Sequence, residues 1–307
     1  MTGGPWGPAA GPGNTGPGGH GSTGIGPGGR FMATDAAYDE ARVVLLGAPW
    51  DATVTYRPGA RFGPGRIREA SYGLEEYSIT LDRSLLDLAV HDAGDLDLPF
   101  GAPAAALEQI RREVAAIARD GKVPVLLGGE HLITLAAVQA LAEGPAGRDL
   151  VVIQMDAHAD LRDTYQGQEL SHATVMRRVS QVVGPGRLVQ LGIRSGDREE
   201  VTFGRRHTRF CTQRVLEPLQ EVLAELGDVP LYVSIDIDVL DPAWAPGTGT
   251  PEPGGIDLHE LLAAVYALKG RHIIGADLVE VAPTLDPTER TVVTAAKIIR
   301  ELLLSWF

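Results

Sequence analysis

The chain of 307 residues carries 44% hydrophobic and 22% charged residues, proportions that exclude a fibrous, collagen-like or wholly disordered protein. Its 40 Asp and Glu outnumber its 27 Lys and Arg, and the resulting net charge of −13 disfavours binding to nucleic-acid phosphates but not to cationic small molecules or divalent metals. Because the chain has one cysteine, Cys211, no apolar run of about 18 residues and no secretion signal, we expect a soluble protein of the cytoplasm.

The first thirty residues are rich in glycine and proline. They hold 13 of the 38 glycines and five of the 21 prolines, and they contain few apolar side chains that a core could bury. We therefore predict a flexible tail over residues 1–32, followed by a single catalytic domain over residues 33–307.

Short apolar runs then alternate with amphipathic stretches. The runs are aliphatic on both faces, which is typical of strands that are covered on both sides. The alternation predicts an α/β fold of three layers (α/β/α), in which helices cover both faces of a mostly parallel central sheet. In chain order we predict strand 42–47, helix 104–118, strand 123–127, helix 133–141, strand 150–154, helix 171–182, strands 187–191 and 231–235, helix 258–268 with Asp257 as its N-cap, strand 272–278 and helix 289–304.

Three of the predicted strands are followed directly by residues of types that can bind metals. These strands are 123–127, 150–154 and 231–235. Functional groups collect at the carboxyl ends of strands in open parallel sheets. In addition, an i, i+2, i+4 spacing places side chains on the same side of an extended segment. The candidate ligands are His131 after the first strand, Asp156, His158 and Asp160 after the second, and Asp236 and Asp238 after the third.

Each of these motifs alone also fits a turn, a helix cap or a packed histidine. Together they would be costly to bury without compensating cations, and two divalent ions would balance the four carboxylates. Oxygen-rich ligation with two imidazoles and no sulfur favours Mn²⁺, although Ni²⁺, Co²⁺ or Zn²⁺ would also occupy such a site. A water activated between two such ions near neutral pH is a nucleophile.

A further carboxylate, Glu280, follows the predicted strand 272–278 at the edge of an apolar run and has no cationic neighbour in sequence. It would pair either with a distant arginine of the chain or with a cationic group of a substrate. A guanidinium suits the second role, because it is planar, permanently charged and able to form two parallel hydrogen bonds with a carboxylate.

Four motifs together resemble those of the ureohydrolases, the family of arginases, agmatinases and their relatives. They are GGEH at 128–131, DAHAD at 156–160, SIDIDVLDP at 234–242 and DLVEVAP at 277–283, in the family's order. The segments 55–71 and 241–255 also resemble family loops, so that the likeness spans residues 42–304. It implies an arginase-like fold and a centre of two manganese ions that hydrolyses guanidino groups.

The resemblance also implies a role for each residue. Glu280 would accept the guanidinium of the substrate and aim its carbon at the nucleophile. His172 would contact the substrate or assist proton transfer, and either His172 or Asp160 would protonate the leaving amine. Urea and an amine would be the products, and the protein would form a homo-oligomer, a trimer or hexamer. The implied ligands are His131, Asp156, Asp160 and Asp236 for one manganese, and Asp156, His158, Asp236 and Asp238 for the other.

The stretch 161–173 lacks the Asn- and Ser-containing pattern of arginases and is more similar to agmatinases. Agmatine, cleaved to putrescine and urea, is therefore the first candidate substrate. Asp163 would meet its distal ammonium, although a solvated loop charge is the more common reason for such a residue. Guanidinobutyrate, guanidinopropionate and free guanidine remain alternatives within the chemistry. Two alternatives do not hydrolyse guanidino groups: a non-catalytic metal-binding relative and a two-metal phosphohydrolase. The sequence lacks the Gly-rich, Lys-containing phosphate loop that would support a phosphohydrolase.

Overall fold

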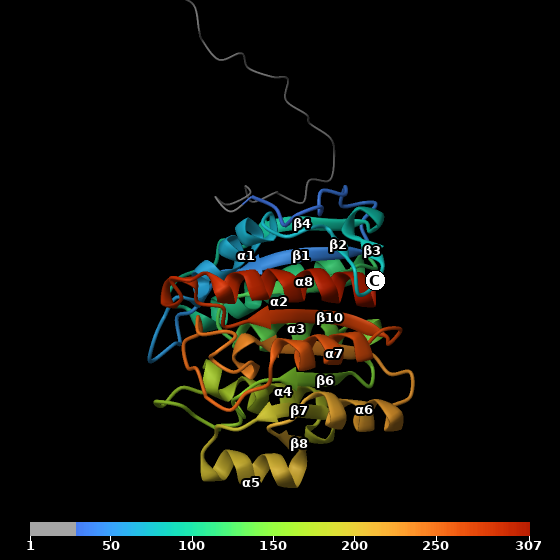
Figure 1. Cartoon of the computed structure of the whole chain (residues 1–307). Helices are drawn as coiled ribbons and strands as arrows, with labels where there is room; N and C mark the ends of the chain where they lie inside the picture. Colours follow the sequence, from blue (N-terminus) through green and yellow to red (C-terminus); the bar gives the residue numbers. More distant parts are fainter. Residues whose placement is uncertain (1–28) are drawn as a thin grey trace, which may run out of the picture.

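The computed structural model describes residues 29–307, in which the predicted strands pair into one parallel sheet (Figure 1). The sheet has eight strands in the order β4-β1-β5-β10-β9-β6-β7-β8, and a separate antiparallel pair joins β2 and β3. The strands are β1 (Val43–Ala48), β2 (Tyr77–Ser78), β3 (Arg83–Ser84), β4 (Val90–Asp95), β5 (Val123–Gly128), β6 (Val151–Met155), β7 (Leu188–Ile193), β8 (Arg209–Thr212), β9 (Leu231–Asp236) and β10 (Ile273–Val279).

Helices form a layer on each face of this sheet. The helices α1, α8, α7 and α6 contact one another in series, and α2, α3 and α4 form a second series on the opposite face (Figure 1). The α5 helix lies beside β8 at the end of the sheet. The helices are α1 (Gly63–Ser71), α2 (Pro103–Arg119), α3 (Ile133–Glu143), α4 (Val175–Val183), α5 (Arg198–His207), α6 (Leu216–Glu225), α7 (Leu258–Ala267) and α8 (Arg290–Trp306).

Two hydrophobic cores hold the three layers together, one on each face of the sheet. Strand β1 contributes side chains to both cores, because successive side chains of a strand point to opposite faces of the sheet. Val43 and Leu45 belong to the core under α7 and α8, whereas Val44 and Leu46 belong to the core under α2 and α3. This double burial explains why the strands are apolar along their whole length, and it confirms the predicted three-layer α/β architecture.

The predicted strands and helices are all present, with ends shifted by a few residues. Asp257 caps α7 as expected, by accepting a hydrogen bond from the backbone N–H of Glu260. In the predicted helix 171–182, the first turn is a 3₁₀ helix (His172–Thr174) and α4 begins at Val175. The prediction missed the strands β2, β3, β4 and β8 and the helices α1, α5 and α6. Strand β4 alternates buried and half-buried positions at the edge of the sheet and therefore lacks a continuous apolar run.

The predicted tail lies mostly outside the described residues, so that its flexibility stays a prediction. Phe31 and Met32, which that prediction assigned to the tail, already pack against the domain. The side chain of Phe31 is buried and its backbone N–H donates to Asp92, while the backbone N–H of Met32 donates to Ser71. Across residues 29–307, no helix combines the length and the apolar character that crossing a bilayer requires.

Candidate active site

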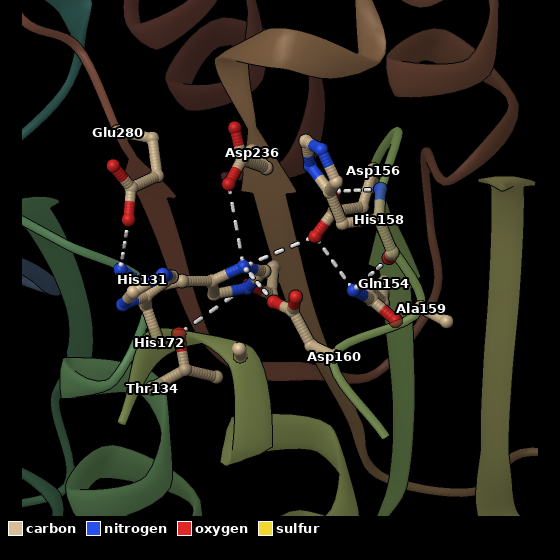
Figure 2. A network of polar contacts seen from close by, with 12 residues as sticks. His131, Thr134, Gln154, Asp156, His158, Ala159, Asp160, His172, Asp236 and Glu280 are labelled. Carbon is tan, nitrogen blue, oxygen red and sulfur yellow. Dashed lines mark hydrogen bonds and ion pairs between the residues drawn. The ribbon is translucent and has the colours of Figure 1, made fainter. Parts of the chain in front are cut away.

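Four strands that are neighbours in the sheet, β5, β10, β9 and β6, end at the same edge because they are parallel. The residues after these strands converge there, and Figure 2 shows four carboxylates turned toward His131, those of Asp156, Asp160, Asp236 and Glu280. The structure thus brings together all six predicted metal ligands and Glu280, although they are spread over 150 residues of sequence. They are His131 after β5, Glu280 after β10, Asp236 and Asp238 at the end of β9, and Asp156, His158 and Asp160 after β6.

Two of the site carboxylates lie on backbone in the left-handed region. Asp160 has φ +53° and Glu280 has φ +63°, a conformation that costs energy for residues other than glycine. Neighbouring backbone holds both in place: Glu280 donates its N–H to the carbonyl of Gly129 at 2.8 Å, and the carbonyl of Asp160 accepts from Met176 at 3.0 Å. These turns direct each side chain back toward the centre of the site, at the end of its strand.

His131 forms the centre of the first ligand cluster. Its Nδ1 lies 3.1 Å from an oxygen of Asp156, 3.2 Å from one of Asp160 and 3.3 Å from one of Asp236. On the other side of the ring, Nε2 lies 2.9 Å from the hydroxyl of Ser234, which donates its proton to Asp277. Ser234 therefore accepts from Nε2–H, so that Nδ1, which faces the three carboxylates, is the ring nitrogen that would bind a metal.

His158 forms the second cluster with Asp238 and Asp156. Its Nδ1 lies 3.0 Å from Asp238 and 3.7 Å from Asp156, which therefore borders both clusters. Nδ1 of His131 and Oδ2 of Asp238 are buried without a hydrogen-bond partner within the described part of the chain. Buried polar atoms are rarely left unsatisfied. Within each of two groups, the ligand atoms lie within 4.8 Å of one another, a spacing that fits a divalent cation; the groups are His131, Asp156 and Asp236, and Asp156, His158 and Asp238.

The electrostatics of the cluster lead to the same interpretation. Burial, together with Asp156, raises the pKa of Asp160 to about 7, and burial and Asp238 raise the pKa of Asp236 well above its usual range. Burial acts to lower the pKa of His131, but its contacts with Asp156, Asp160 and Asp236 outweigh burial and raise it well above its ordinary value. Carboxylates in close contact oppose one another's ionisation, and bound cations would relieve that repulsion.

The ligand clusters open into a cavity of about 380 Å³, which Glu280 and His172 also line. The carboxylate of Glu280 accepts the backbone N–H of His131 at 2.8 Å, while burial and the nearby Glu130 raise its pKa to about 8. Burial lowers the pKa of His172 to about 4. The cavity wall thus offers a carboxylate for a cationic group and a neutral imidazole for proton transfer.

Asp163, the residue predicted to meet the distal end of the substrate, does not line this cavity. Its side chain is 72% exposed and pairs with Arg178 at 2.8 Å. The wall instead carries Arg162, Asp197 and Glu200, which the sequence analysis missed. Asp197 closely follows β7, which lies next to β6, so the rule that directs attention to strand ends would have found it.

The geometry agrees with comparisons to known proteins. The sequence model of the Arginase family matches residues 41–305. The agmatinase of Bacillus subtilis (strain 168) is 50% identical over 279 residues, which cover 90% of this chain and 96% of that protein. The N(1)-aminopropylagmatine ureohydrolase of Thermococcus kodakarensis is 39% identical and covers 85% of this chain and 89% of that protein. The structure of the agmatine ureohydrolase of Thermoplasma volcanium has a TM-score of 0.82 at 33% identity, covering 90% of this chain and 93% of that chain. These likenesses confirm the resemblance and the arginase-like fold: the chain belongs to the Arginase family of ureohydrolases.

Proposed function

We propose that this protein hydrolyses agmatine to putrescine and urea with two Mn²⁺ ions per chain. The observation that carries the proposal is one cavity wall that combines both ligand clusters with the buried carboxylate of Glu280. Relatives named agmatinase at up to 50% identity support agmatine as the substrate. The small volume of the cavity suits an unbranched guanidino compound rather than a polymer.

The six predicted ligands would hold the two metal ions, with Asp156 and Asp236 shared between them. When bound, such ions supply a water of lowered pKa as nucleophile and offset negative charge that develops during the reaction. Mn²⁺ suits four carboxylates and two imidazoles, whereas Ni²⁺ and Co²⁺ are alternatives for the same donors.

The remaining chemistry belongs to residues of the chain itself. Glu280 pairs with the guanidinium and holds its carbon toward the ligand clusters. His172 is neutral at physiological pH because of its lowered pKa, so it first accepts a proton and then delivers it to the leaving amine. Asp160 is the second candidate for this delivery. Water and the guanidinium are consumed, and urea and the protonated amine leave.

The distal ammonium of agmatine would meet the wall that carries Asp197 and Glu200, both of which are paired with Arg162. We retain Asp163 as a lesser candidate, since its exposed side chain does not line the cavity. We also propose that the protein acts in the cytoplasm as a homo-oligomer, a trimer or hexamer, which light scattering on the eluting protein would measure.

The experiment is a urea-release assay on protein loaded with Mn²⁺, with a Ni²⁺-loaded sample beside it. The panel is agmatine, arginine, 4-guanidinobutyrate, 3-guanidinopropionate and guanidine, and metal content is measured on the same samples. The proposal predicts the highest kcat/KM on agmatine. A higher kcat/KM on another compound of the panel would support the same reaction with that compound as the substrate. No urea from any member, at two metals per chain, would favour a non-catalytic relative.

A further inference from the structure

Glu130 is a fully buried carboxylate that the proposed reaction does not use. It lies between Gly129 and the ligand His131, and no Lys or Arg pairs with it within residues 29–307. An unpaired carboxylate is costly to bury unless hydrogen bonds compensate it. The residue that donates hydrogen bonds to this carboxylate therefore indicates its role.

That partner is Thr53, in the loop after β1. The backbone N–H of Thr53 donates to Oε2 of Glu130 at 2.8 Å, and its hydroxyl makes a short hydrogen bond with Oε1. Two donors from one residue on one carboxylate fix both the backbone and the χ1 angle of Thr53. The hydroxyl oxygen of Thr53 is thereby held at a defined point beside the cavity.

The same hydroxyl oxygen contacts His172. It accepts the backbone N–H of His172 at 3.1 Å and lies 3.4 Å from Nδ1 of the ring, and Ser171 lies 3.3 Å from the same Nδ1. The ring is therefore held at Nδ1, and Nε2 is the ring nitrogen left for a substrate in the cavity.

We propose that Glu130 and Thr53 are a positioning pair, which acts on the reaction through the orientation of the His172 ring. Neither residue lines the cavity. Glu130 orients Thr53, and Thr53 holds the ring, so that its free nitrogen meets the leaving amine. The inference rests on the proposed function in one respect: it takes His172 as the group that carries the proton.

A purely structural role would be to anchor the loop after β1 to the end of β5. Thr53→Val separates the two interpretations, because valine keeps the shape of threonine and the backbone N–H that anchors the loop, but has no hydroxyl. Thr53→Ser keeps the hydroxyl. Thr202→Val is a matched control, since the hydroxyl of Thr202 donates to Arg198 within its own helix.

The test is a double-mutant cycle with Thr53→Val, His172→Ala and the combined variant, each loaded with Mn²⁺ to the metal content of wild type. We expect Thr53→Val to lower kcat roughly 10- to 100-fold with little change in KM, by analogy with the loss of hydrogen bonds that orient metal-binding histidines. Thr53→Ser and Thr202→Val should stay within about threefold of wild type, a margin that separates them from that loss. In the His172→Ala background, Thr53→Val should cost nothing further, because residues that act through one another are not additive. Glu130→Gln should follow the pattern of Thr53→Val.

A kcat of Thr53→Val equal to that of wild type, or a full additional loss in the His172→Ala background, would overturn the inference. Crystal structures of wild type and Thr53→Val give a readout without turnover: the ring of His172 should leave its position in the variant, and an unmoved ring would count against the pair. Failure of the proposed function is distinct, because it appears as absent urea release by wild type, whatever the ring position.

Discussion

At the scale of single residues, no ion pair within the described part of the chain explains why the carboxylate of Glu280 is buried. Its carboxylate is almost fully buried, lies on left-handed backbone and has no Lys or Arg paired with it within residues 29–307. The distant arginine that would have explained it structurally is therefore not present in the described chain. The strain and the burial are consistent with a residue kept for a ligand rather than for stability.

Glu280→Gln tests this role with almost no change in shape. The amide loses the charge that pairs with a guanidinium, and removing one partner of a buried ion pair typically costs 2–5 kcal/mol, so we expect kcat/KM to fall roughly 30-fold to several-thousand-fold. Metal content should stay at that of wild type. Glu143→Gln, at an exposed position on α3, is the control and should leave both quantities unchanged. Wild-type kinetics in the Glu280 variant would remove this residue from the reaction.

At the scale of elements, the sequence predicted the strands well because six of them are continuous apolar runs that are buried on both faces. It could not predict their order, since hydrogen bonds between strands are not encoded in local patterns. Strand β10, the last in the chain, lies between β5 and β9. That insertion places Glu280 beside His131, a proximity that no spacing in the sequence indicates. Asp163 failed to reach the cavity for a similar reason, because Arg178 on α4 pairs with it.

The junction between β5 and the loop after β1 depends on Gly129. A Cβ on this residue would lie 1.9 Å from the backbone oxygen of Trp50, and the carbonyl of Gly129 holds the backbone of Glu280. Gly129→Ala must therefore separate two backbone segments that flank the site. We expect a loss of about 2 kcal/mol or more in the free energy of unfolding, measured in urea, together with lower metal content.

Gly227→Ala is the matched control, because no atom lies within 4 Å of a Cβ there. It should change the free energy of unfolding by no more than about 0.5 kcal/mol. If Gly129→Ala behaved like this control, the tight approach of β5 to the Trp50 backbone would not be a constraint on the fold.

The packing of α8 against α7 and the β2 turn depends on a buried carboxylate with a pH signature. Glu301 accepts hydrogen bonds from Lys297, Ser78 and Tyr266. Burial acts to raise its pKa, but these bonds and Arg300 outweigh burial and lower it to about 2. A pKa lowered by folding stabilises the protein above the unfolded value, near 4.5, and the effect is lost as the pH falls from there toward 2.

We therefore expect Glu301→Gln to lower the free energy of unfolding by about 1–2 kcal/mol at pH 7, less than the full pKa shift implies because solvent screens part of the network. The difference between wild type and variant should shrink as the pH falls from about 4.5 toward 2. Urea unfolding of the metal-free proteins measures it, with the exposed Glu221→Gln as control. A difference that is constant with pH would mean that the charge of Glu301 is not what stabilises this packing.

At the scale of the whole molecule, the fold concentrates negative charge where four strands end. Four aspartates and Glu280 share this edge in a chain whose net charge is already −13, and no Lys or Arg pairs with any of them in the described residues. Folding without metal must therefore bring carboxylates together at a cost that shows in their raised pKa values. Metal binding should couple to the stability of the entire domain and not only to the site.

Removal of the metal should consequently lower the melting temperature. A ligand at about 1,000 times its Kd stabilises the folded state by about 4 kcal/mol, and each kcal/mol shifts the melting temperature by about 2–4 °C in a domain of this size, so we expect a fall on the order of 10 °C after chelation. Calorimetry of Mn²⁺-loaded and chelated protein measures it. In Asp238→Ala, which removes a ligand of the second cluster, metal content and this difference should both fall, because fewer donors remain to couple metal to folding. Equal melting temperatures for loaded and chelated wild type, at two metals per chain, would mean that the acidic edge is stable on its own and that its charges are compensated in some other way.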